Sequence, residues 1–128
     1  MSYYFNKTLD CGFDEAIARA TEALKTEGFG VLTEIDVAAT LKKKIGVDFR
    51  PYRILGACHP KLAFEALTLE NKIGTMLPCN VVVQDAGGGK TEIAAIDPVA
   101  SMQAVDNPRL KKAAEEVRGK LQAVMARL

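Results

Sequence analysis

Two strand-like runs separated by a short glycine-rich segment constrain the fold of this chain most strongly. Residues 79–84 contain three consecutive valines, and a second run covers residues 91–96. The intervening segment 86–90 holds Gly87, Gly88 and Gly89, which reach the backbone angles of a tight turn without steric cost. These features predict a β-hairpin, so at least part of the sheet must be antiparallel.

The rest of the chain alternates between strand-like and helical patterns. The predicted strands cover residues 3–9, 29–35, 52–57, 79–84 and 91–96. The predicted helices begin at Phe13, Val37, Pro60 and Pro108, and the first of them stops at Gly28. In the second strand, Phe29, Val31 and Ile35 are expected on one side. This order predicts one α+β domain over residues 1–128, with helices on one face of a mostly antiparallel sheet.

Composition restricts the classes of partner. Seventeen basic and sixteen acidic residues give a net charge of +1, which leaves no broad electrostatic footprint for nucleic acid. No apolar run approaches the roughly 18–20 residues that cross a bilayer. Residues 1–7 lack the apolar core of a secretory signal. We therefore expect a cytoplasmic protein that binds neither nucleic acid nor membrane.

Each of two cysteines lies beside a proline at the edge of a predicted strand. Cys58-His59-Pro60 closes one strand and opens a helix, whereas Pro78-Cys79-Asn80 opens the next strand. If these strands are neighbours, both thiols lie at the same end of the sheet. With Cys11 the chain has three cysteines, an odd number that argues against a secreted disulfide framework.

The cysteine pair allows several chemistries. The helix after Cys58 favours a thiolate there, and Asn80 or His59 could orient a bound group. Together, Cys58 and Cys79 have the softness to bind a small ligand or a soft metal ion such as zinc or copper(I). Alternatively, the two thiols cycle through a disulfide in redox or sulfur-handling chemistry. The third alternative is that both cysteines only fill the core of a structural, partner-binding domain.

Other motifs carry no further site. The Gly87–Lys90 region lacks the spacing of a phosphate-binding loop and precedes a strand rather than a helix. His59 is the single histidine, so a multi-histidine site within one chain is excluded. No general acid and base pair is visible near the cysteines, and the residues identify no cofactor. The sequence leaves open whether the protein is an enzyme.

A homodimer is expected from the apolar surface at the two ends of the chain. Tyr3, Tyr4 and Phe5 precede the first turn, and the C-terminal helix carries an apolar stripe that repeats at three and four residues. The stripe includes Leu110, Val117, Leu121 and Val124. Apolar surface beyond the needs of one small sheet is typical of an interface. The alternative is that the helix covers the sheet of its own chain, which would account for most of the stripe.

The chain resembles the domain-of-unknown-function family 302 of bacteria and archaea over nearly its whole length. The motifs that carry the resemblance are Asp36-Val37, Leu41 to Lys44, Tyr52 to Pro60, Ile73-Gly74, Leu77 to Asn80 and Asp97-Pro98. The resemblance implies a TBP-like β-α-β(4)-α fold with a curved antiparallel sheet, a helical insertion at Pro60, and a homodimer. It implies no activity, but it makes Cys58, Pro60, Pro78 and Cys79 candidate site residues.

Overall fold

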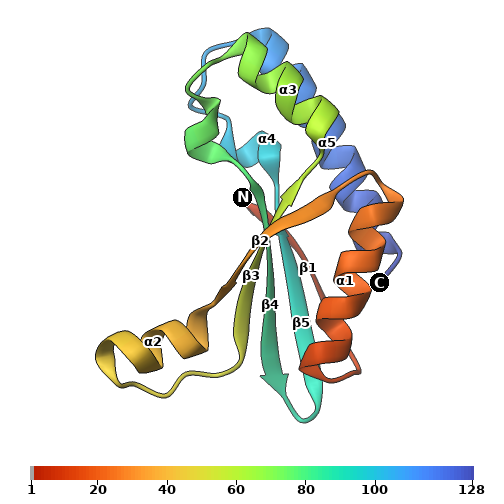
Figure 1. Ribbon diagram of the computed structural model, residues 1–128. Helices are drawn as coiled ribbons and strands as arrows, with labels where there is room; N and C mark the ends of the chain where they lie inside the picture. The colour runs from red at the N-terminus through yellow and green to blue at the C-terminus, as the bar shows by residue number, and fades with distance from the viewer. Residues whose placement is uncertain (1) are drawn as a thin grey trace.

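The computed structural model describes residues 2–128, and within that range the chain forms one five-stranded sheet (Figure 1). Its strands are β1 (Tyr4–Leu9), β2 (Gly30–Asp36), β3 (Tyr52–Cys58), β4 (Cys79–Gly87) and β5 (Lys90–Ile96). Their spatial order is β1-β5-β4-β3-β2, and every neighbouring pair is antiparallel. The predicted α+β class and the predicted hairpin between β4 and β5 are therefore confirmed.

Two long helices cover one face of this sheet. They are α1 (Phe13–Thr26) and α5 (Pro108–Ala126), which lie side by side in Figure 1. Helix α3 (Pro60–Leu69) packs on α5 above the upper end of the sheet, next to the 3-10 turn η1 (Ile73–Met76) and the short helix α4 (Pro98–Ser101). Within residues 2–128, no helix is both long and apolar enough to cross a bilayer.

Helix α2 (Val37–Ile45) does not join the other helices on that face. It projects from the lower end of the sheet in Figure 1, and none of its residues is buried. Local signals still define it: the Asp36 carboxylate accepts the Ala39 N–H over 2.9 Å, and Gly46 ends the helix with a φ of 69°. The helix therefore forms from capping and propensity without contributing to the core.

The main core lies between the sheet and the pair α1–α5. Its fully buried side chains include Leu24, Leu55, Val83, Ile93 and Leu121. The strand residues among them alternate with residues on the opposite, helix-free face, as a half-buried antiparallel sheet requires. A smaller cluster joins Ala66 of α3 and Ile73 of η1 to Met102, Leu110 and Ala114.

One predicted strand face is wrong. Val31 packs against the core as expected, but Ile35 lies on the helix-free face opposite Ile54 and is 49% exposed. A register shift between Val31 and Thr33 inserts an extra residue into β2, which reverses the face of every residue after it. Alternation along the sequence cannot reveal such a bulge.

The C-terminal stripe predicted to reach a partner is used inside the chain. Leu110, Leu121 and Val124 are buried in the two core clusters, whereas Tyr3 is 64% exposed and lies away from them. The surface proposed from sequence is therefore not available as one patch. The homodimer itself stays a prediction, and of the residues named for it Tyr3 and Tyr4 remain exposed.

Light scattering tests this prediction directly. At tens of micromolar protein, we expect the mass of a dimer, since exposed apolar side chains such as Ile45 and Phe49 remain on the surface of each chain. The mass of a single chain at that concentration would contradict the homodimer.

A close approach at Gly56 positions the upper end of the sheet. A Cβ atom at Gly56 would lie 2.8 Å from Cγ of Pro78 and would also collide with the Thr33 hydroxyl. We expect Gly56→Ala to lower the free energy of unfolding by about 1–3 kcal/mol, because the proline ring cannot rotate away. Denaturant titration measures this change.

Gly119→Ala is the matched control for this substitution. Gly119 lies in α5, and a Cβ atom there meets nothing within 4 Å. Because alanine is the better helix former, this variant should be more stable than the wild type by about 0.5–1 kcal/mol. Equal stability of the two variants would show that Pro78 does not press on Gly56.

Candidate functional site

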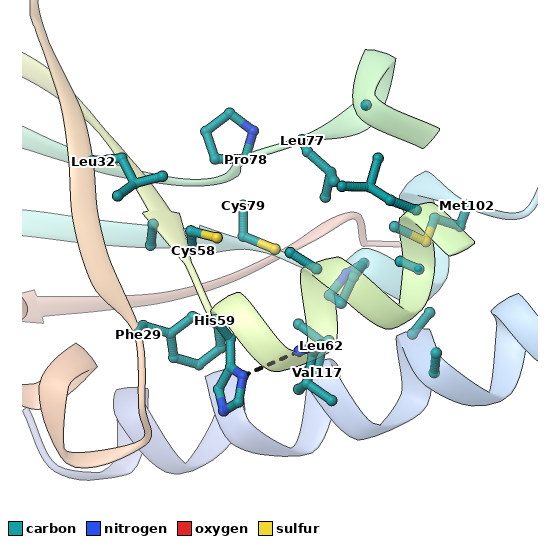
Figure 2. Close-up of a pocket in the computed structure, with 18 of the residues that line it drawn as sticks. Phe29, Leu32, Cys58, His59, Leu62, Leu77, Pro78, Cys79, Met102 and Val117 are labelled. Carbon is teal, nitrogen blue, oxygen red and sulfur yellow. Dashed lines mark hydrogen bonds between the residues drawn. The ribbon is translucent and has the colours of Figure 1, made fainter. Parts of the chain in front are cut away.

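An apolar cavity of about 370 Å³ opens where α3 and α5 meet the upper end of the sheet (Figure 2). Its size lies within the range of small-molecule pockets. Six elements contribute side chains to its wall. Representative residues are Leu32 of β2, Ala57 of β3, Cys79 of β4, Leu62 of α3, Pro98 of α4 and Val117 of α5.

Alanines on the two facing helices contribute to this space. Helix α3 presents Ala63 and Ala66 to the cavity, and α5 presents Ala113 and Ala114. Larger side chains such as Leu62 and Leu110 keep the two helices apart. Because a methyl side chain extends little from its helix, unfilled volume remains between the alanines. The same four positions could hold larger apolar residues only at the expense of the cavity.

Cys58 and Cys79 lie in the wall of this cavity. Cys79 opens β4 directly opposite Ala57, so Cys58 is one residue beyond that pair at the end of β3. Both thiols are free and half-buried. Figure 2 shows the Cys58 sulfur directed toward Cys79, whose own sulfur points farther into the cavity. The prediction that the two cysteines share one end of neighbouring strands is confirmed.

His59 lines the cavity but also caps the helix that follows it. Its Nδ1 accepts the backbone N–H of Leu62 over 3.4 Å, and its ring packs edge-on against Phe29 with 5.5 Å between centroids. The ring also lies against Gly28, where a Cβ atom would come within 2.8 Å of Nε2. His59 therefore has a structural role that fixes its orientation.

The remaining predicted site residues are distributed around the cysteine pair. Pro78 lines the cavity, whereas Pro60 is exposed at the first position of α3 and does not. Asn80 pairs with Gly56 and faces the opposite side of the sheet, where it lines a separate surface pocket with Tyr52. The prediction that Asn80 orients a group bound between the cysteines is not supported, because neighbouring strand residues point to opposite faces.

The two thiols differ in their environments. Burial raises the pKa of the Cys79 thiol from 9.0 to about 11, and negative charge at Cys58 contributes further to this rise. Burial disfavours the thiolate because it removes the charge from water. Cys79 is therefore a protonated thiol at neutral pH.

The soft-metal hypothesis has few ligands to use. Within residues 2–128, no three His, Cys, Asp or Glu side chains are placed to share a metal ion. Cys58 and Cys79 alone provide two sulfur ligands, and metal binding requires each as a thiolate. The raised pKa of Cys79 opposes that ionisation. Two sulfur ligands are fewer than the four of a closed tetrahedral zinc site.

Sequence reasoning missed most of the cavity wall. Leu32, Leu67, Met102 and Val117 come from four separated segments, and none lies beside a cysteine in the sequence. The one local signal was the pair of alanines on each of two predicted helices. Small residues on a helix also occur in ordinary close packing, so this signal does not locate a cavity.

Comparisons with known proteins agree on one family. The model of the family described as "Domain of unknown function DUF302" matches residues 5–128. The chain is also similar to a crystal structure of an uncharacterized conserved DUF302 protein from Bacillus stearothermophilus. The two are 34% identical with a TM-score of 0.91, and the match covers 99% of this chain and 98% of the other. No curated protein matches the chain.

The alkaline titration of Cys79 can be measured by alkylation. We expect its rate of reaction with iodoacetamide, followed by peptide mass spectrometry, to rise with a midpoint near pH 11. In Cys58→Ser the midpoint should fall but remain above 9.0, because burial is the larger cause. A midpoint at 9.0 in the wild type would contradict the buried environment.

The same shift predicts how stability depends on pH. The folded protein holds the Cys79 proton more tightly than the unfolded chain does, so this contribution is complete below pH 9.0. It is lost as the pH rises toward 11, and the free energy of unfolding should fall over that interval. Cys79→Ala should remove this part of the slope.

Proposed function

The chain belongs to the DUF302 family, and we propose that it binds a small, uncharged, apolar molecule in the cavity beside Cys58 and Cys79. The family description assigns no activity. The observation that carries the proposal is the cavity itself, which has the volume of a ligand pocket and a wall made mainly of aliphatic side chains.

The chemistry of the wall supports an uncharged ligand. Among the described residues, those that line the cavity include no Lys, Arg, Asp or Glu. Its polar side chains are Thr33 and His59, together with the two thiols. A charged ligand would lose its hydration here without gaining an ion pair, which is costly in an apolar environment.

The rim of the cavity offers a route of entry for such a molecule. Leu32 and Leu67 line the cavity and are also 68% and 43% exposed. At such a rim an entering apolar ligand replaces its contacts with water by contacts with these side chains before it reaches the interior. The volume is therefore connected to solvent through an apolar edge.

A partner-binding role is the second candidate. The projecting α2 segment leaves Ile45 67% exposed, and Val47 and Phe49 after it are also exposed. Apolar side chains grouped on a segment that contributes nothing to the core favour contact with another protein. This role is compatible with ligand binding, because α2 lies at the opposite end of the sheet from the cavity (Figure 1).

A neutral fluorescent probe tests the proposed function. The chain contains no tryptophan, so a probe such as N-phenyl-1-naphthylamine can be followed without interference from tryptophan emission. We expect a saturable, blue-shifted increase in its emission at one equivalent. Ala114→Leu should weaken binding by about tenfold, because the larger side chain occupies the cavity.

Ala126→Leu provides the matched control on the same helix. Ala126 is exposed and does not line the cavity, so this variant should bind the probe as the wild type does. Ala63→Leu, on the opposite helix, should reproduce the loss if Ala114→Leu proves unstable. Unchanged affinity in both cavity variants, with circular dichroism confirming that they are folded, would contradict the proposal.

A further inference from the structure

We propose that the ligand is a small apolar disulfide, which Cys58 and Cys79 reduce by thiol–disulfide exchange. This inference rests on the proposed function and specifies its ligand class and its reaction. Two free thiols lie together in the wall of an otherwise mainly aliphatic cavity. A ligand that matches both features has an apolar body and a soft sulfur group.

The position of the two cysteines suits successive attack on one ligand. Cys58 follows Ala57, the residue paired with Cys79, so the thiols belong to adjacent strands at their common end. Both line the same cavity, and Figure 2 shows the Cys58 sulfur directed toward Cys79. A ligand sulfur bonded to Cys58 would therefore lie within the cavity and close to the second thiol.

Their unequal environments assign the order of the two steps. Cys79 is held as a thiol by burial and by charge at Cys58, so Cys58 is the first to attack. Once Cys58 is bonded to the ligand sulfur it carries no charge. The charge at Cys58, one of the two causes that raise the pKa of Cys79, is then absent. Cys79 therefore ionises more readily once the mixed disulfide has formed.

The exchange balances without an additional oxidant. The Cys58 thiolate, its proton released to solvent, attacks one ligand sulfur, so that the ligand S–S bond breaks and a mixed disulfide forms. The first ligand thiolate leaves and takes up a proton. Cys79 then releases its proton to solvent and attacks the Cys58 sulfur, so that the bond between Cys58 and the ligand sulfur breaks and a Cys58–Cys79 disulfide forms. The second ligand thiolate leaves and takes up a proton. The ligand gains two electrons and the protein loses two, and a small dithiol reductant restores the thiols.

Cys11 is an internal comparison for this chemistry. It is also a free thiol, but it is buried in the main core and does not line the cavity. The guanidinium of Arg19 lies 3.9 Å from its sulfur. A reaction that depends on the cavity should therefore spare Cys11, whereas nonspecific oxidation of thiols in a loosened protein should include it.

Two aromatic disulfides of different charge test the inference. The probes are neutral 4,4′-dithiodipyridine and the dianionic 5,5′-dithiobis(2-nitrobenzoate), each with reduced protein near neutral pH. For each thiol we take the ratio of its reaction rate with the neutral probe to its rate with the dianionic probe. We expect this ratio to be about tenfold or more higher for the protein than for glutathione, because a carboxylate must lose its hydration to enter the cavity. Two equivalents of thiopyridone should be released per chain.

Mass spectrometry then identifies the products. The wild type should lose two hydrogens and retain no pyridylthio group, with the new bond joining Cys58 to Cys79. Cys79→Ser should stop after one equivalent and keep the adduct on Cys58. Cys58→Ser should react more slowly than either, because burial raises the pKa of the remaining cavity thiol, Cys79.

The outcomes separate this inference from the proposed function. If the wild type binds N-phenyl-1-naphthylamine but shows no preference for the neutral disulfide, the exchange is wrong and ligand binding stands. Two stable pyridylthio adducts on Cys58 and Cys79, with no bond between them, would also overturn the exchange. If the fluorescent probe does not bind, yet the cysteines form the predicted bond selectively, ligand binding in the reduced protein fails instead.

Discussion

The pairing of β3 with β4 is the constraint on which the other features of the molecule depend. In this register Leu55 faces Val81 on the helix-covered side, and Ala57 faces Cys79 at the upper end. A shift of one residue would move the buried set to the open face and separate the two thiols. Pro78 reinforces the arrangement, because its ring lies where a side chain at position 56 would be. The same contacts therefore support the core and place the candidate site.

The cavity results from how the helices meet above that register. Helix α3 packs on α5 rather than on the sheet, and each presents alanines to the space between them. A close-packed interior normally fills such a space, so a volume of about 370 Å³ is a departure from ordinary packing. The protein retains it next to two thiols, and His59 holds the start of α3 over the cavity through its bond to Leu62.

Environment, rather than residue type, distinguishes the two cysteines. Both end or begin a strand and both are half-buried, yet burial and the neighbouring sulfur keep Cys79 protonated. A pair of thiols of which one has its pKa raised by burial is suited to ordered chemistry, in which the other group acts first and the buried one responds. A metal centre instead requires both cysteines as thiolates, because each thiol ligand must lose its proton for the metal to bind.

The sequence by itself determined the elements whose signals are local. Capping by Asp36, the glycine turn of the hairpin, and the helix that begins at Pro60 all depend on residues close together in the chain, and alternation located the strands. It also predicted that Cys58 and Cys79 would be neighbours. Only the tertiary structure decided that β2 contains a bulge, that Asn80 faces away from the thiols, and that α5 buries its stripe within the chain. The cavity belongs to this second group, because it is a space left between six elements and its existence depends on their packing distances.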